Sequence, residues 1–225
     1  MICGRWGTED ANRTLRRALS TLSLSEAERG GYVHLTEMRK FAASISFYWA
    51  LAGLIEADQW TDVRKTMAAE IVDGSKLRAA VSVLPFNAYD NVNWKFIVGL
   101  ENHHTPISDF LVDLFRTEAA TELAMTAQQA EDYFDLLEIN VALGFAHYRV
   151  EEMKMSEGLW FWMPVGRFMW RQRRATLEAR LREIETMSPA SPYFTAGMLG
   201  GSVQAATGTI AAIRDYLSKV SGRFW

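Results

Sequence analysis

The sequence has a single cysteine and no long hydrophobic run. Cys3 stands alone among 225 residues, which excludes an intramolecular disulfide framework and is compatible with a reducing compartment. The most apolar stretch, residues 41–55, is broken by Ser44 and Ser46 and is shorter than the ~20 residues that a membrane-spanning helix needs. Residues 1–10 lack the apolar core of a secretory signal. We therefore expect a cytoplasmic protein that does not cross a membrane.

A strong net charge is also missing. The chain has 24 Lys and Arg against 27 Asp and Glu, and its formal net charge is −3. This balance argues against overall electrostatic attraction to nucleic acid or anionic lipid, although it is compatible with a local basic patch. Hydrophobic residues make up 49% of the chain, so a globular protein with a sizeable core is expected.

The motifs of common nucleotide-binding and catalytic sites are absent. The Gly-rich segment 197–202 precedes an expected helix and has backbone amides that can hold an anion, but it lacks the lysine of a Walker loop and the dinucleotide spacing. A tight turn between helices is the alternative. The pairs Asp109/Asp113 and Glu131/Asp135 each share a helix face, which suits either acid–base chemistry or stabilisation of a helix dipole. None of these features requires a cofactor, and we predict none.

Helical periodicity runs through most of the chain, because apolar residues recur three or four positions apart. Segments 25–28 and 126–129 have the capping-box pattern that starts a helix. Thr61, Thr105 (which precedes a proline) and Ser202 are further candidate N-caps. We expect helices over residues 8–22, 25–40 and (separately or continuously) 41–57, then 60–71, 76–84, 105–120, 126–153, 165–187 and 202–220.

The least helical part is residues 72–93. Gly74, Pro85 and an asparagine-rich cluster give this segment the composition of turns. It is the one candidate boundary between two lobes of a single domain that spans residues 1–225. We predict an all-α fold, an irregular multi-helix bundle of about eight helices.

The most distinctive segment is residues 158–174, with the sequence GLWFWMPVGRFMWRQRR. It places tryptophans, phenylalanines and arginines around one Pro-Val-Gly turn, and Trp and Arg dominate the hot spots of binding interfaces. Two alternatives are a corner where helices pack together and a face whose arginines pair with carboxylates. We predict that this segment binds a protein partner or an anion through Trp160, Trp162, Arg167, Phe168, Trp170, Arg171 and Arg174.

A weaker candidate is a metal site near the middle of the chain. Glu101 and His104 have the Glu-x-x-His spacing of carboxylate-bridged di-iron bundles, and His103 and Asp109 lie nearby. Such bundles need a second pair with this spacing, and neither of the other two histidines has a carboxylate three residues before it. We therefore predict no metal and retain these four residues as the alternative.

The order of several short motifs resembles a known family. The motifs are YWALAG at 48–53, Gln-Trp at 59–60, Leu-Pro at 84–85, HTPISDFL at 104–111, PVGRFMWR at 164–171 and AGMLGG at 196–201. Together they resemble a helical C-terminal region of large bacterial proteins whose N-terminal part is a sirtuin-like or P-loop NTPase domain. Many of those proteins are suspected anti-phage defence proteins. The resemblance covers most of the chain.

The resemblance implies a regulatory role. In that family the chemistry belongs to the N-terminal domain, and the helical region is similar to a sensing, regulatory or assembly part. This chain has no Rossmann or P-loop segment, so the NAD or ATP chemistry of the family carries over to none of its residues. The resemblance implies either a stand-alone version that acts in trans or a remnant of a larger protein.

The predicted function is non-enzymatic. We expect a helical protein-interaction or regulatory module of a prokaryotic defence system, with a protein partner or self-association. One alternative is a helical enzyme with a metal or small-molecule site near His103 and His104. A second is the binding of single-stranded nucleic acid by residues 160–174, where aromatic rings would stack on bases.

Overall fold

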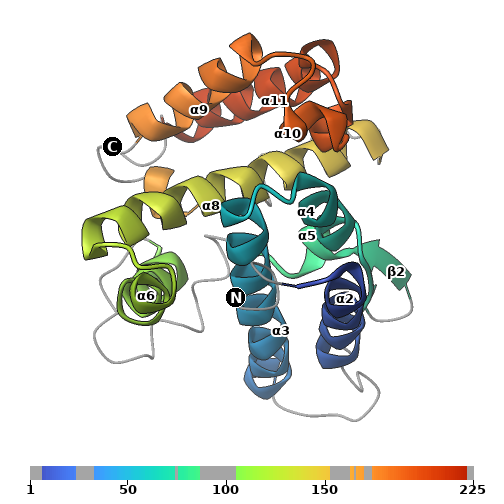
Figure 1. Cartoon of the computed structure of the whole chain (residues 1–225), viewed down its shortest axis with the longest axis vertical. Helices are drawn as coiled ribbons and strands as arrows, with labels where there is room; N and C mark the ends of the chain where they lie inside the picture. The colour runs from blue at the N-terminus through green and yellow to red at the C-terminus, as the bar shows by residue number, and fades with distance from the viewer. Residues whose placement is uncertain are drawn as a thin grey trace. The chain divides into compact units, whose positions relative to one another are not determined.

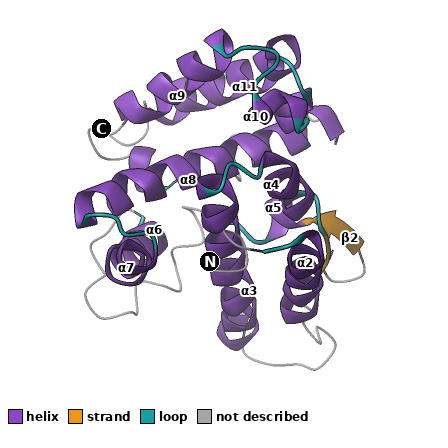
Figure 2. Ribbon diagram, in the orientation of Figure 1, coloured by secondary structure: helices purple, strands orange, loops and turns teal. Residues whose placement is uncertain are grey.

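The protein is built mainly from helices, as Figure 2 shows. Among the described residues the only strands are two short ones that pair with each other. The predicted all-α class with a multi-helix architecture is therefore confirmed. The computed structural model describes residues 7–23, 33–73, 76–86, 105–152, 163–164, 166–169 and 174–221.

The chain forms two compact units, Met1–Pro85 and Phe86–Trp225. That residues 1–225 fold as one domain stays a prediction. Within the described parts of both units, no helix combines the length and the apolar composition that crossing a bilayer requires.

The first unit is organised around its longest helix. Phe47, Leu51 and Leu54 recur at helical spacing along this helix and are fully buried, so their face forms the core. The helix is continuous from Val33, and the capping box expected at 25–28 lies outside the described residues. The elements of this unit are α2 (Glu9–Ser23), α3 (Val33–Glu56), α4 (Trp60–Met67), β1 (Glu70–Asp73), β2 (Lys76–Ala79) and α5 (Ala80–Val83) (Figure 1).

A β-hairpin replaces parts of two expected helices. The helix expected over 60–71 ends at Met67, and the helix expected over 76–84 shrinks to α5. β1 and β2 pair antiparallel, with Glu70 opposite Ala79. The cap at Thr61 was also wrong, because α4 starts after Gln59, whose side chain makes no capping hydrogen bond.

The second unit is organised around α8 (Ala127–His147). Helices α9 (Arg174–Thr186) and α11 (Val203–Ser221) both contact α8 (Figure 1). Leu137 of α8, Leu181 of α9 and Ile213 of α11 are fully buried. The elements before α8 are α6 (Pro106–Leu114), the π-helical turn η3 (Phe115–Ala119) and α7 (Ala120–Glu122), which together cover the helix expected over 105–120.

Two of the expected helix starts are confirmed by their hydrogen bonds. The hydroxyl of Thr126 accepts a hydrogen bond from the Gln129 backbone N–H at 3.2 Å, and the Gln129 side chain accepts one from the Thr126 N–H at 2.8 Å. The Ser202 hydroxyl accepts a hydrogen bond from the Ala205 N–H at 3.1 Å and so caps α11. Thr105 does precede α6, although its side chain makes no capping hydrogen bond.

Two other expected helices are interrupted. The helix expected over 126–153 gives way after His147 to a π-helical turn, η4 (Tyr148–Glu152). The helix expected over 165–187 is replaced near its start by a short 3-10 turn, η6 (Arg167–Met169), and the described part of α9 starts at Arg174. Within η6, the side chain of Arg167 forms ion pairs with Glu131 and Asp135 of α8.

Candidate functional site

Three acidic residues of α8 lie on successive turns of one face: Glu131, Asp135 and Glu138. The Nε atom of Arg167 lies 3.0 Å from Oδ1 of Asp135, and its Nη2 atom pairs with Oε1 of Glu131. Both the Arg167 and the Asp135 side chains are almost completely buried. Breaking such a pair is costly, because it leaves one charge buried without a partner.

Ser108 connects three segments at this cluster. Its hydroxyl accepts a hydrogen bond from the backbone N–H of Arg167 at 3.0 Å and donates one to Oε2 of Glu138 at 2.8 Å. Ser108 belongs to α6, Glu138 to α8 and Arg167 to η6. The hydrogen bonds therefore join α6, α8 and the segment around η6 inside the second unit.

The pKa of Glu138 is strongly shifted. Burial raises its pKa to about 8, with Asp135 adding to the increase, while the hydrogen bond from Ser108 opposes it. The carboxyl is therefore protonated at neutral pH. A Cβ atom at Gly166 would overlap the carboxyl group of Glu138, so a larger residue there would displace this carboxyl from its present position.

The burial of this cluster corrects part of the predicted docking surface. Arg167 is 2% exposed and Phe168 is 0% exposed, so neither side chain is available on the surface to a partner. Pairing of an arginine with carboxylates was the alternative at Arg167, and the structure shows that arrangement. Glu131 and Asp135, considered for acid–base chemistry, instead hold Arg167 in place.

Most other predicted site residues lie outside the described part of the chain. These are Trp160, Trp162, Trp170 and Arg171 of the docking stretch and Glu101, His103 and His104 of the metal alternative. Arg174 starts α9, and Asp109 is buried on α6. Among the residues that the structure describes, no group of three or more His, Cys, Asp or Glu side chains is arranged to hold a metal ion.

The Gly-rich segment 197–202 forms a tight turn. It contains the 3-10 turn η7 (Met198–Gly200), which lies between α10 (Pro192–Thr195) and α11. Gly200 has a φ of +81°, and a Cβ atom there would lie 2.7 Å from the Cβ atom of Ala205. The segment thus forms a tight turn between helices, which was the alternative to an anion-binding loop.

A basic groove lies between α2 and α4 in the first unit, and the residue patterns did not reveal it. It is open to solvent and has a volume of about 510 Å³. Five of its nine lining residues are cationic, and only Glu70 is acidic. The cations are Arg13, Arg16 and Arg17 on α2 and Arg64 and Lys65 on α4.

Polar contacts fix α2 against α4 at this groove. Asp62 of α4 accepts a hydrogen bond from Nδ2 of Asn12 at 3.1 Å and another from Nη1 of Arg16, also at 3.1 Å. The side chains of Arg16 and Asp62 are mostly buried, and Asn12 is fully buried. At the rim, Lys65 pairs with Glu9 at 3.4 Å. Arg16 is therefore oriented by the fold itself, and it belongs to the base of the groove.

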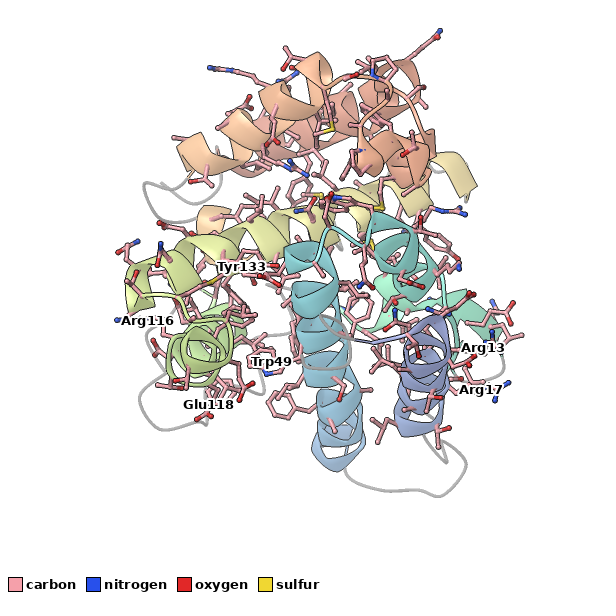
Figure 3. The ribbon with its side chains drawn as sticks, in the orientation of Figure 1. Arg13, Arg17, Trp49, Arg116, Glu118 and Tyr133 are labelled. Atoms are coloured by element: carbon pink, nitrogen blue, oxygen red, sulfur yellow. The ribbon has the colours of Figure 1, made fainter. Side chains whose placement is uncertain are left out.

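The remaining cations are more available. Arg17 and Arg64 are exposed and make no ion pair with any described residue. Arg13 pairs only with Asp10, at 3.5 Å on the same helix, and both side chains are largely exposed. Figure 3 shows Arg13 and Arg17 extending outward from α2. The triplet Arg13, Arg16, Arg17 is visible in the sequence, but the closeness of α4 is not.

No protein-family model matches the chain, and no curated protein or solved structure is significantly similar to it. The resemblance to the helical region of bacterial defence proteins therefore stays a prediction that rests on the motifs quoted above.

Proposed function

We propose that this protein is a non-enzymatic interaction module that binds an anionic partner in the groove between α2 and α4. The observation that supports this best is the pair Arg17 and Arg64. They project from two different helices, line one groove and make no ion pair with a described residue. Charged groups held in this way are available to form charge-assisted hydrogen bonds with a partner.

The construction of the groove supports the same proposal. Asp62 holds Arg16 and Asn12 across the gap between the helices, so the groove exists before any partner arrives. Arg16 is therefore already ordered before binding, which favours affinity, whereas the exposed Arg17 and Arg64 become ordered only when the partner binds. The groove is also a local feature, because the whole chain has a formal net charge of −3.

The family resemblance points to the same class of function. A helical region that senses, regulates or assembles needs a binding surface and no reacting centre. We propose that this chain acts as such a module in a prokaryotic defence system, with the groove as one contact. The residues of the 160–174 stretch that lie outside the described part of the chain stay a predicted second contact.

Retention on a heparin column tests the groove, because heparin presents a dense row of anionic groups. The test variant combines Arg17→Glu with Arg64→Glu. The matched control combines Arg116→Glu with Lys219→Glu, two exposed cations of the second unit that pair with acids on their own helical segments. Both double variants change the net charge equally, and circular dichroism checks that both fold.

We expect the wild type and the control to elute at similar salt concentrations and the groove variant to elute at clearly lower salt. Equal elution of the two double variants would show that retention follows net charge alone, and it would refute the groove as the binding site.

A further inference from the structure

We propose that the anion bound in this groove is a run of phosphate groups, as in a polyphosphate or a phosphodiester chain. This inference rests on the proposed function of the groove and specifies the chemistry of its partner. The observations that carry it are the kind of cation, the spacing of the cations and the small size of the other lining residues.

Arginine dominates the groove. Four of its five cations are arginines, and only Lys65 is an ammonium. A guanidinium has five N–H donors in a planar fork that matches the oxygens of phosphate or carboxylate. A carboxylate and a phosphodiester each offer two charged oxygens and one charge, whereas the terminal phosphate of a polyphosphate offers three acceptor oxygens and up to two charges. Cations that converge from two helices are best satisfied by a chain that presents several such groups close together.

The cations form a row along α2. Arg13 and Arg17 are four residues apart, which places them on one face with a rise of about 6 Å between them. Arg64 and Lys65 line the same groove from α4. This arrangement suits a ligand with several anionic groups in sequence, because five cations on two helices can pair with more anionic groups than one small anion carries.

Arg64 and Lys65 also stabilise their own helix. They lie in the last turn of α4, where cations stabilise the helix dipole. This effect explains why they occur on α4, but it does not explain why Arg13 and Arg17 line the same space. The convergence of both helices on one groove is the feature that the proposed ligand accounts for.

The other lining residues provide little besides space. They are Ser20, Ala68, Ala69 and Glu70, none of which has an aromatic ring for a base or a large apolar surface for peptide side chains. Recognition in this groove therefore depends on the charge of the ligand and is independent of the base sequence of a nucleic acid. Glu70 is exposed at the rim and opposes an incoming phosphate, so removing its charge will strengthen binding.

Isothermal titration calorimetry with three probes tests the proposal at about 0.1 M salt, where charges more than ~10 Å apart are screened. The probes are sodium tripolyphosphate, a short oligothymidylate and polyglutamate, compared at equal concentrations of anionic groups. Each is titrated into the full chain, the Arg17→Glu/Arg64→Glu variant, the Arg116→Glu/Lys219→Glu control and Glu70→Gln.

We expect tripolyphosphate, oligothymidylate or both to bind at least about tenfold more tightly than polyglutamate, which corresponds to ~1.4 kcal/mol. The groove variant will lose at least as much affinity, the control will keep the wild-type affinity and Glu70→Gln will gain affinity. Binding of tripolyphosphate alone identifies a free phosphate chain as the source, and binding of the oligonucleotide identifies a phosphodiester chain.

Two results would count against these proposals in different ways. If polyglutamate binds as tightly as the phosphate probes and the groove variant loses all three, the phosphate inference is overturned while the anion-binding function stands. If no probe binds, or if the groove variant binds all of them like the control, the proposed function of the groove falls as well.

Discussion

Glu138 makes the free energy of unfolding depend on pH. Its carboxyl is protonated at neutral pH because burial raises its pKa to about 8, whereas the carboxyl of the unfolded chain titrates near 4.5. Between these two pH values, folding requires the uptake of a proton. The contribution of Glu138 to the free energy of unfolding is therefore fully present below about pH 4.5 and is lost as the pH rises through about 8.

Replacing Glu138 with glutamine removes this titration and keeps an oxygen that can accept the hydrogen bond from Ser108. We expect Glu138→Gln to be more stable than the wild type at pH 9, by several kcal/mol at most, since each pKa unit corresponds to ~1.4 kcal/mol. The gain will shrink toward pH 5. Urea unfolding of both proteins at pH 5, 7 and 9 measures the difference, and parallel pH profiles would contradict the buried protonated carboxyl.

Arg167 is the second residue on which the cluster depends. Its replacement by methionine keeps the length of the side chain but leaves Asp135, which is fully buried, without its ion pair. We expect Arg167→Met to lower the free energy of unfolding by about 3–5 kcal/mol. The exposed Arg182 of α9 serves as the control, and Arg182→Met should cost less than ~0.5 kcal/mol. Similar urea midpoints for the two variants would argue against a structural role for Arg167.

At the scale of elements, α8 depends on a local start signal. The capping box of Thr126 and Gln129 satisfies backbone N–H groups that the helix cannot pair internally. Thr126→Ala is therefore expected to destabilise the protein by about 1 kcal/mol. Thr207→Ala is the matched control, since Thr207 is exposed within α11 and bonds only to the carbonyl of Val203. Thermal unfolding compares them, and an equal shift in Tm would show that the cap contributes nothing specific.

The elements also differ in how well their type and bounds can be predicted from the sequence. α2 and α8 start close to their expected positions, because helical periodicity and caps are signals that neighbouring residues provide. The hairpin of β1 and β2 was missed, since its eight strand residues have weak alternation and helical segments flank it. The interruption at η6 was missed for another reason. Arg167 is buried within the second unit, where it pairs with acids of α8 that are distant in the sequence.

At the scale of the whole molecule, the sign of the net charge and the sign of the groove are opposite. The chain has a formal net charge of −3, yet five cations line the groove. Long-range repulsion of an anion thus competes with short-range attraction, and the cations of the groove displace the counterions of a bound phosphate ligand. The groove is expected to bind its ligand only through close contacts that salt weakens.

We therefore predict that the affinity for tripolyphosphate falls steadily as salt is raised from 50 to 300 mM. The dependence on salt will be shallower for Arg17→Glu/Arg64→Glu, since fewer ion pairs form in that variant. Calorimetry at several salt concentrations gives both slopes. An affinity that does not respond to salt would mean that ion pairs with the groove do not hold the ligand.

The sequence by itself determined the helical class and the starts of α8 and α11, because caps and periodicity act between residues a few positions apart. The positions of the two charged sites, the Arg167 cluster and the basic groove, are determined only by the tertiary structure. Arg167 meets Glu131 across 36 positions of the chain, and Arg16 meets Asp62 across 46. Electrostatic interactions depend on distance in space and on burial, and neither quantity is visible in the order of the residues. For that reason a predicted surface arginine became a buried one, and a basic groove appeared where the sequence showed two separate helices.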